Sequence, residues 1–497
     1  MNPQTAILLS LGIPLAGALL IALFGRHPNL REGVTLTTAA LLFGTVITLV
    51  PGVMDGARPA VTLIEMLPGL PLRFEVEPLG MLFALVASGL WIVNSIYSIG
   101  YMRANKEAHQ TRFYICFAIA LASTLGIAFA GNMLTLFVFY EALTLSTYPL
   151  VTHKGDAAAK QGGRTYLGIL LFTSIGLQLL AILWTWQVAG TLDFIPGGIL
   201  AGKVSGPVVG VLLLLYMYGI GKAALMPFHR WLPAAMVAPT PVSALLHAVA
   251  VVKAGVFTVM KVVIYIFGID LLAESGQNLW LMYLAAATLL IASLVAMTKD
   301  NLKARLAYST VSQLAYVVLG AALATSWGVI GGSMHIAMHA MGKITLFFCA
   351  GAIYTATRKA EISEMAGLGR VMPVTFCAFF IGALSIIGLP PLGGSWSKWY
   401  LMLGAAQADQ LIMIAVLMVS SLFNVAYLVP IAVRGFLGPA PDGPLPAAAG
   451  GGAAPRVRIR EAPMFCVVPL TLTALGCIAL FFFADPLYRL LEPIAAP

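Results

Sequence analysis

Long runs of apolar residues dominate the chain, and short segments that hold most of its charges separate them. An α-helix needs roughly 20 apolar residues to cross the hydrocarbon core of a bilayer, and the runs reach that length. Apolar runs of this length exclude an outer-membrane β-barrel, whose strands alternate over about ten residues. The pattern predicts an all-α polytopic membrane protein with about fourteen spans, over residues 5–24, 32–51, 79–102, 113–130, 131–151, 165–187, 208–237, 240–268, 278–297, 306–324, 327–356, 371–407, 410–434 and 464–484.

Composition agrees with a membrane protein and excludes a soluble domain. Of the 497 residues, 60% are hydrophobic and 9% are charged, whereas soluble domains carry roughly a quarter charged residues. The net charge of +9 does not indicate binding to nucleic acid, because the basic residues are spread over short loops and form no single patch. The five cysteines are scattered through apolar segments without the spacing of metal ligands, so we interpret them as core residues. We expect neither a metal site nor a cofactor.

The basic residues are distributed unequally between the two sets of loops. Nineteen of the 28 Lys and Arg lie in loops that follow odd-numbered runs, and four lie in the segments on the other side. Cytoplasmic loops carry the excess of Lys and Arg in membrane proteins. We therefore expect a multi-pass protein of the inner (plasma) membrane with both termini on the non-cytoplasmic side.

Two of the predicted spans are interrupted by helix-breaking residues, each beside a lysine. Pro and Gly free backbone groups inside the membrane, and this is tolerated only where the break is buried in protein or lines a cavity. A pair of broken spans is typical of transporters that are built from inverted repeats. The residues of the two breaks are Pro227, His229, Pro233, Pro390, Pro391 and Gly393.

The breaks predict how the chain is divided. Spans four to eight and nine to thirteen are expected to form two inverted five-helix repeats, joined at mid-membrane by a polar axis. A Pro-, Gly- and Ala-rich segment before the last span is expected to be a flexible cytoplasmic linker. The predicted parts are three N-terminal helices (1–112), the first repeat (113–268), the second repeat (269–434), the linker (435–463) and a C-terminal helix (464–497).

Charged residues lie inside several predicted spans, where each costs roughly 2.5–3.5 kcal/mol if it faces lipid. We therefore expect them to face the bundle interior or an internal file of water. Structural ion pairing is the alternative, but one acid cannot neutralise four cations. Because a buried lysine exchanges its proton readily, a proton pathway fits the composition better. The residues are Glu141, Lys222, Lys253, Lys343 and Lys398.

Lys261 is expected to differ from the other intramembrane lysines. It lies near the end of its predicted span, about two helical turns beyond Lys253. A long basic side chain at that depth can extend to the membrane surface. We therefore interpret Lys261 as an anchor and leave it out of the pathway.

Histidines extend the polar pattern in the eighth and eleventh spans. His335, His339 and Lys343 recur every four residues, so they share one helix face. A histidine can accept or release a proton near neutral pH, although a lone helical histidine is more often a core residue. His247 precedes Lys253 by about one and a half turns, so water or another helix would have to link them. A further polar face, which either joins helices or belongs to the pathway, consists of Ser309, Ser312, Gln313 and Tyr316.

Four segments over the fifth to twelfth spans carry long and specific sequence patterns. They read KAALMPFHRWLPAAMVAPTPVSALLHA, KDNLKARLAYSTVSQLAYVVLG, HIAMHAMGKITLFF and FVFYEALTLSTYPLV. These patterns resemble the antiporter-like subunits of respiratory complex I and of Mrp-type multisubunit cation:proton antiporters. The resemblance implies a fourteen-helix core with two inverted repeats and no bound redox centre. Because the chain stops soon after the last span, it resembles most the D-type subunits of the Mrp antiporters.

The resemblance also implies roles for individual residues. In such subunits an acid on the fifth span pairs with a lysine on the broken seventh span, and the matching residues are Glu141 and Lys222. The family usually has an acid directly after WLP, where this chain has Ala234, so no acid is expected at that turn. The positions that match the rest of the family pathway are His247, Lys253, Lys343 and Lys398.

We predict a proton-translocating subunit of an Mrp-type Na⁺:proton antiporter, with other membrane subunits, protons, Na⁺ and lipid as its partners. The alternative is a proton-pumping subunit of a redox-driven complex, either NADH:quinone oxidoreductase or a membrane-bound hydrogenase. A haem protein with histidine ligands is disfavoured, because His335 and His339 share one helix and have no obvious facing partner except His247. A self-sufficient secondary transporter is disfavoured by the resemblance. The chain shows no nucleophile triad, phosphate-binding glycine loop or metal cluster, so it is expected to make or break no bonds itself.

Overall fold

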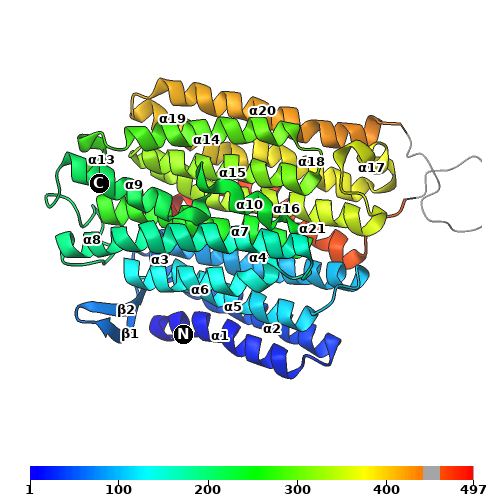
Figure 1. The fold of residues 1–497 in the computed structure, drawn as a ribbon, viewed down its shortest axis with the longest axis horizontal. Coiled ribbons are helices and arrows are strands. Elements are labelled where there is room, and N and C mark those ends of the chain that lie inside the picture. The colour runs from blue at the N-terminus through cyan, green and yellow to red at the C-terminus, as the bar shows by residue number, and fades with distance from the viewer. Residues whose placement is uncertain (440–458, 496–497) are drawn as a thin grey trace, which may run out of the picture.

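The computed structural model describes residues 1–439 and 459–495. Long α-helices lie side by side with nearly parallel axes (Figure 1). Within the described residues, eleven helices are long and apolar enough to cross a membrane, judged by length and composition. The prediction of an all-α polytopic membrane protein is therefore confirmed. Most of the predicted linker lies outside the described residues.

The N-terminal part contains a β-hairpin that the sequence pattern did not predict. Strand β1 pairs with β2 in antiparallel register, and the hairpin lies beside the start of α1 in Figure 1. The helices α1, α2 and α4 begin where the sequence favours a start: Pro occupies the first turn of each, and Asn2 caps α1 by accepting from the Gln4 N–H at 3.0 Å. The elements are α1 (Pro3–Leu23), α2 (Pro28–Ile47), α3 (Val50–Met54), β1 (Ala60–Leu67), β2 (Leu70–Glu75) and α4 (Pro78–Ala104).

The region predicted as the first repeat combines α-helices with π-helical and 3-10 turns. The π-helices η1 and η5 lie inside longer helical segments and η6 ends one, and π-turns are frequent at functional sites. The elements are α5 (Gln110–Ala128), α6 (Met133–Val151), α7 (Ala157–Thr173), η1 (Ser174–Gln178), α8 (Leu179–Ala189), α9 (Gly206–Gly219), η2 (Gly221–Ala223), η3 (Phe228–Arg230), α10 (Trp231–Ala234), η4 (Ala235–Val237), α11 (Thr240–Ala244), η5 (Leu245–Val249), α12 (Val251–Lys261) and η6 (Val262–Phe267).

The remaining described chain consists of helices joined by short connections. Each of the predicted spans contains at least one helix, and a short amphipathic helix, α22, follows the last of them. The elements are α13 (Ile269–Ser275), α14 (Leu279–Thr298), α15 (Leu302–Ala322), α16 (Ser326–Thr357), η7 (Ile362–Met365), α17 (Leu368–Val371), α18 (Pro373–Ile387), α19 (Gly394–Gln407), α20 (Leu411–Leu437), α21 (Met464–Phe482) and α22 (Ala484–Ala495).

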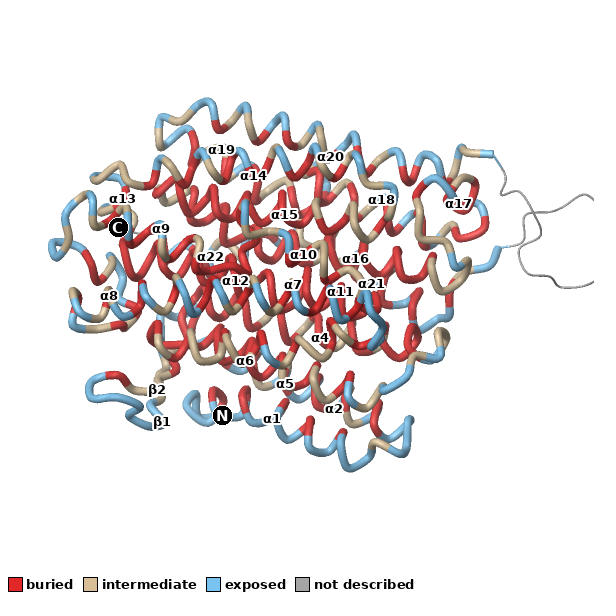
Figure 2. The backbone as a smooth tube through the Cα atoms, viewed as in Figure 1, coloured by how far each residue is buried: buried red, intermediate tan, exposed pale blue. Residues whose placement is uncertain are grey.

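Two helical segments form the centre of the bundle. The most apolar stretch of Thr240–Phe267 is 100% buried and that of Ser326–Thr357 is 94% buried, whereas that of Leu411–Leu437 is only 33% buried. Figure 2 shows the same arrangement, with buried backbone in the middle and exposed backbone at the periphery. Helices α11 and α12 and the π-turn η5 all pack on α16. A helix that is apolar on all sides belongs in such a core, so charged residues on these two segments are held away from lipid.

Both predicted breaks are present. Helix α9 ends at Gly219 and passes into short 3-10 turns, and α18 ends at Ile387 before α19 begins at Gly394. Side chains and neighbouring backbone satisfy some of the freed groups: the Trp231 indole N–H donates to the Gly221 carbonyl at 2.9 Å. The residues named for the breaks all lie in these connections or in the short helices beside them: Pro227, His229, Pro233, Pro390, Pro391 and Gly393.

Candidate functional site

Seven of the predicted pathway residues are buried inside the bundle, and none is more than 6% exposed. We call this set the lysine–histidine axis. Its four lysines have no carboxylate oxygen within 4.0 Å among the described residues, and hydroxyl, carbonyl or imidazole groups contact their amines. The lysine–histidine axis consists of Lys222, His247, Lys253, His335, His339, Lys343 and Lys398.

The break in the seventh span holds Lys222 against α6. Its Nζ donates to the Tyr140 carbonyl at 2.8 Å and to the Thr144 hydroxyl at 2.5 Å, and it lies 3.2 Å from the centre of the Tyr140 ring. The ion pair with Glu141 that the resemblance implied is not formed within 4.0 Å in the described structure. The buried Glu141 Oε1 has no hydrogen-bond partner there. Oxygen atoms of Tyr140 and Thr144 on α6 therefore accept the hydrogen bonds of the Lys222 amine in place of the expected carboxylate.

Gly255 brings α12 close to the broken turn. A Cβ at this position would collide with the backbone of Lys222 and Ala223. Only glycine therefore permits the contact, because it has no side chain to separate the two backbones. No hydrogen bond joins Lys222 to Lys253 among the residues that the structure describes.

The centre of the lysine–histidine axis lies between α12 and α16. The Lys253 Nζ is 2.5 Å from His339 Nδ1, so a second helix provides a partner for Lys253. The His339 and His335 rings stack with their centroids 5.8 Å apart. His247 lies 4.5 Å from the Phe347 ring, and neither of its ring nitrogens has a hydrogen-bond partner in the described structure. His247 is therefore a buried polar group that could accept a bond from water.

His335 connects the centre to the second break. Its two ring nitrogens lie 2.9 Å from Ser397 Oγ and 3.1 Å from Gln313 Oε1. Its ring stacks on Tyr316 with a centroid distance of 5.3 Å. The Tyr316 hydroxyl in turn accepts from Lys398 Nζ at 3.4 Å. Polar groups therefore continue from Lys253 to Lys398.

Some residues on the polar face of α15 contact the lysine–histidine axis, and another joins α15 to a neighbouring helix. Ser309 accepts from Lys343 Nζ at 2.6 Å and bonds the Tyr427 hydroxyl at 2.8 Å, so it belongs with the lysine–histidine axis. Ser312 bonds Ser293 at 2.9 Å and joins α15 to α14. Gln313 and Tyr316 contact the axis through His335.

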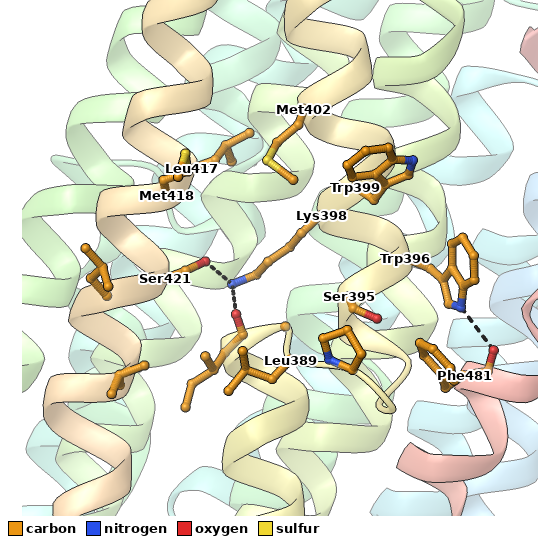
Figure 3. Close-up of a pocket in the computed structure, with 15 residues that line it drawn as sticks. Leu389, Ser395, Trp396, Lys398, Trp399, Met402, Leu417, Met418, Ser421 and Phe481 are labelled. Carbon is orange, nitrogen blue, oxygen red and sulfur yellow. Dashed lines mark hydrogen bonds between the residues drawn. The ribbon is translucent and has the colours of Figure 1, made fainter.

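Lys398 lines a cavity of about 580 Å³. Figure 3 shows its side chain extending from α19 towards Ser421 on α20. Its Nζ donates to the Ile387 carbonyl at 2.9 Å and to the Ser421 hydroxyl at 3.0 Å. The cavity is otherwise mostly apolar, and its rim includes Trp399 and Leu422, which are 52% and 66% exposed.

The interpretation of Lys261 as a surface anchor is wrong. Its side chain is fully buried, and its Nζ lies 3.0 Å from the Glu77 carboxylate. Glu77 is at the N-terminus of α4, in a part of the chain that patterns within single spans could not relate to α12. The Glu77 carboxylate compensates the positive charge of Lys261 inside the protein. The side chain therefore does not need to extend to the membrane surface, as was expected from the sequence.

Sequence reasoning missed several residues that bind the axis lysines and histidines. Their hydroxyl or carbonyl groups are common in membrane helices, so their types alone carried no signal. Thr144 could have been suspected, because it lies about one turn from Glu141 on the same helix face. The residues are Tyr140, Thr144, Ser397 and Ser421.

Two titratable residues lie in loops at the ends of the first helices. His153 is buried, and burial, together with the charge of Arg112, lowers the pKa of His153 to about 4. Burial also raises the pKa of the Glu107 carboxyl, against the opposing effect of nearby basic residues. We expect His153 to be neutral at physiological pH.

Comparison with known proteins agrees with this arrangement. The family model described as "NADH:quinone oxidoreductase/Mrp antiporter, TM" matches residues 130–424, which include every residue of the lysine–histidine axis. The chain belongs to this family. It is thus an antiporter-like subunit by descent, as the sequence patterns predicted.

Individual members of the NADH:quinone oxidoreductase/Mrp antiporter family match much of the chain. NADH-quinone oxidoreductase subunit N of Desulforudis audaxviator is 29% identical over 100% of this chain and 98% of the relative. NADH-quinone oxidoreductase subunit L of Mycobacterium tuberculosis is 33% identical over 78% of this chain and 62% of the longer relative. A chain in the structure of the Mrp complex from Dietzia sp. has a TM-score of 0.87 at 22% identity, covering 100% of this chain and 97% of that one. The last comparison shows that the fold is shared.

Proposed function

We propose that the chain is a proton-translocating subunit of a multisubunit Mrp-type Na⁺:proton antiporter. The observation that carries the proposal is the chemistry around the four axis lysines. Each is buried and bonded to hydroxyl, carbonyl or imidazole groups without a carboxylate within 4.0 Å among the described residues. A lysine in such surroundings can be neutral or charged, and this is what a proton carrier requires.

In the proposed mechanism, Lys222 takes up a proton while Thr144, Tyr140 and the field of Glu141 stabilise its ammonium group. A rearrangement at the broken turn then moves the proton towards Lys253. Since no hydrogen bond joins these two lysines in the described chain, the transfer needs water or a movement of the turn that Gly255 holds against α12.

The second half of the proposed path is more continuous. The Lys253 amine contacts His339, which stacks on His335. From there, Tyr316 leads to Lys398 at the second break. Lys343 forms a side branch through Ser309, and His247 exchanges a proton with the centre through water.

The proposal also covers the topology of the chain. We propose that the chain contains the two inverted repeats, that its other parts have the limits predicted from the sequence, and that both termini lie on the non-cytoplasmic side.

A redox-driven complex is the second candidate. The relative from Desulforudis audaxviator, a subunit of NADH-quinone oxidoreductase, matches this chain over its full length. In such a complex the same lysine–histidine axis would move protons, but electron transfer in other subunits would supply the energy. The partners in either case are membrane subunits of a larger assembly.

The test is proton and Na⁺ flux in vesicles that carry the whole operon. Wild type is compared with Glu141→Ala and Lys222→Met, and assembly is checked by co-purification. We expect Na⁺-dependent proton flux that both substitutions abolish. Flux that requires an electron donor would instead support the redox-driven complex. Wild-type flux in the assembled Lys222→Met complex would refute the pathway.

A further inference from the structure

A buried ion pair outside the lysine–histidine axis joins α12 to α4. Lys261 Nζ lies 3.0 Å from Glu77 Oε1, and the side chains are 0% and 4% exposed. The lysine amine also faces three aromatic rings, with centroid distances of 4.3 Å to Phe194, 4.9 Å to Tyr265 and 5.8 Å to Phe257. Such a cage attracts a cation through the electron-rich faces of the rings.

The carboxylate of this pair accepts several further bonds. Glu77 accepts from the backbone N–H of Leu79 at 2.9 Å and of Gly80 at 2.7 Å, and from the Tyr265 hydroxyl at 2.8 Å. It thereby caps the first turn of α4, where a negative charge is favoured by the helix dipole. Moving a proton from Lys261 to Glu77 would weaken every one of these contacts together with the aromatic cage.

Lys261 therefore differs in kind from the axis lysines. The axis lysines bind hydroxyl, carbonyl or imidazole groups and have no carboxylate within 4.0 Å in the described structure, so each can lose a proton without breaking an ion pair. Loss of the proton from Lys261 would leave the buried Glu77 charge uncompensated, and breaking a buried pair in this way is strongly unfavourable. The surroundings of Lys261 favour a charge that stays in place.

The pair lies where it can position the axis. Lys261 ends α12, and Lys253 lies on the same helix about two turns earlier. The π-helix η6, which contains Tyr265, begins directly after Lys261. We propose that Glu77, Lys261 and Tyr265 are positioning residues: they lock the end of α12 to α4 and hold Lys253 against His339, and Lys261 itself carries no proton. This inference rests on the proposed function.

Substitution of lysine by arginine distinguishes a lock from a carrier. Arginine keeps the positive charge and can pair with a carboxylate, but it does not release its proton in proteins. We expect Lys261→Arg to assemble and to retain the wild-type proton flux and pH profile. The matched variant Lys253→Arg should assemble but lose flux to about a tenth of wild type or less, since a tenfold loss needs only about 1.4 kcal/mol.

The opposite variants test whether the lock is needed. The double variant Glu77→Gln/Lys261→Met removes both charges, and we expect it to reduce flux in the assembled complex. Loss of flux or of assembly in Lys261→Arg would overturn the inference, and so would wild-type flux in the double variant. Lys222→Met is measured beside them. If Lys222→Met and Lys261→Arg both abolish flux, the inference about Lys261 fails and the proposed function stands. If Lys222→Met leaves flux unchanged, the proposed function itself fails.

Discussion

Replacing Thr144 by valine removes one of the two oxygen atoms that accept a hydrogen bond from the Lys222 amine. The hydroxyl lies 2.5 Å from Nζ, and the other acceptor is the Tyr140 carbonyl at 2.8 Å. Valine has nearly the shape of threonine, and the Thr144 site is fully buried. The substitution therefore removes the interaction with little change in packing.

The expected size of the effect follows from the type of hydrogen bond. A bond to a charged group contributes about 1.5–3 kcal/mol. Since about 1.4 kcal/mol corresponds to a factor of ten, the protonated form of Lys222 in this position becomes roughly 10- to 150-fold less populated. If loading of Lys222 limits transport, proton flux through the assembled complex should fall by about tenfold or more.

Flux is measured by the quenching of a pH-sensitive dye in vesicles, at equal amounts of assembled complex. Thr147→Val is the matched control: it lies about one turn along α6, and its hydroxyl bonds the Tyr166 hydroxyl at 2.6 Å instead of a lysine. We expect this control to transport nearly as well as wild type. Wild-type flux in Thr144→Val, or an equal loss in both variants, would refute the role of this hydrogen bond.

Two other predictions concern the packing and the loops. Gly255→Ala should lower the melting temperature and the flux of the complex, because overpacking against the Lys222 backbone costs about 1–3 kcal/mol. Gly168→Ala, at a helix position with open space, should lower neither. Equal melting temperatures of the two variants would contradict this account. His153 has a pKa of about 4 in the folded protein and of about 6.5 in the unfolded chain. Between these two pH values the unfolded chain binds more protons than the folded protein, so the stability of the fold falls as the pH drops from about 6.5 to about 4. His153→Gln should reduce the loss of melting temperature between about pH 7 and about pH 5, and an unchanged loss would show that His153 does not contribute.

Much of the fold could be predicted because the membrane imposes a simple rule on the sequence. Backbone groups in lipid must bond within their own segment, so a long apolar run has to be a helix. The two breaks were visible for the same reason, since Pro and Gly have few other uses in clusters such as GLPPLGGS. The β-hairpin over Ala60–Glu75 was missed, because it lies between spans and its short strands carry no comparable signal.

Within the candidate site, the sequence determined which residues carry charge inside the membrane, but not their partners. Energetic cost alone marked Glu141, Lys222, Lys253, Lys343 and Lys398 as residues that must avoid lipid. Helical spacing also showed that His335, His339 and Lys343 share a face. Neither argument predicts which residues of other helices these side chains contact.

Tertiary structure decided what each charge contacts. Lys222 binds Thr144 where an ion pair with Glu141 was expected, and Lys261 pairs with Glu77 where extension to the surface was expected. The physical reason is that a lysine side chain can satisfy its amine in several ways, and the choice depends on which helix packs beside it. That packing depends on contacts between distant segments, such as the approach of α12 that Gly255 allows, and these are set only when the bundle is assembled.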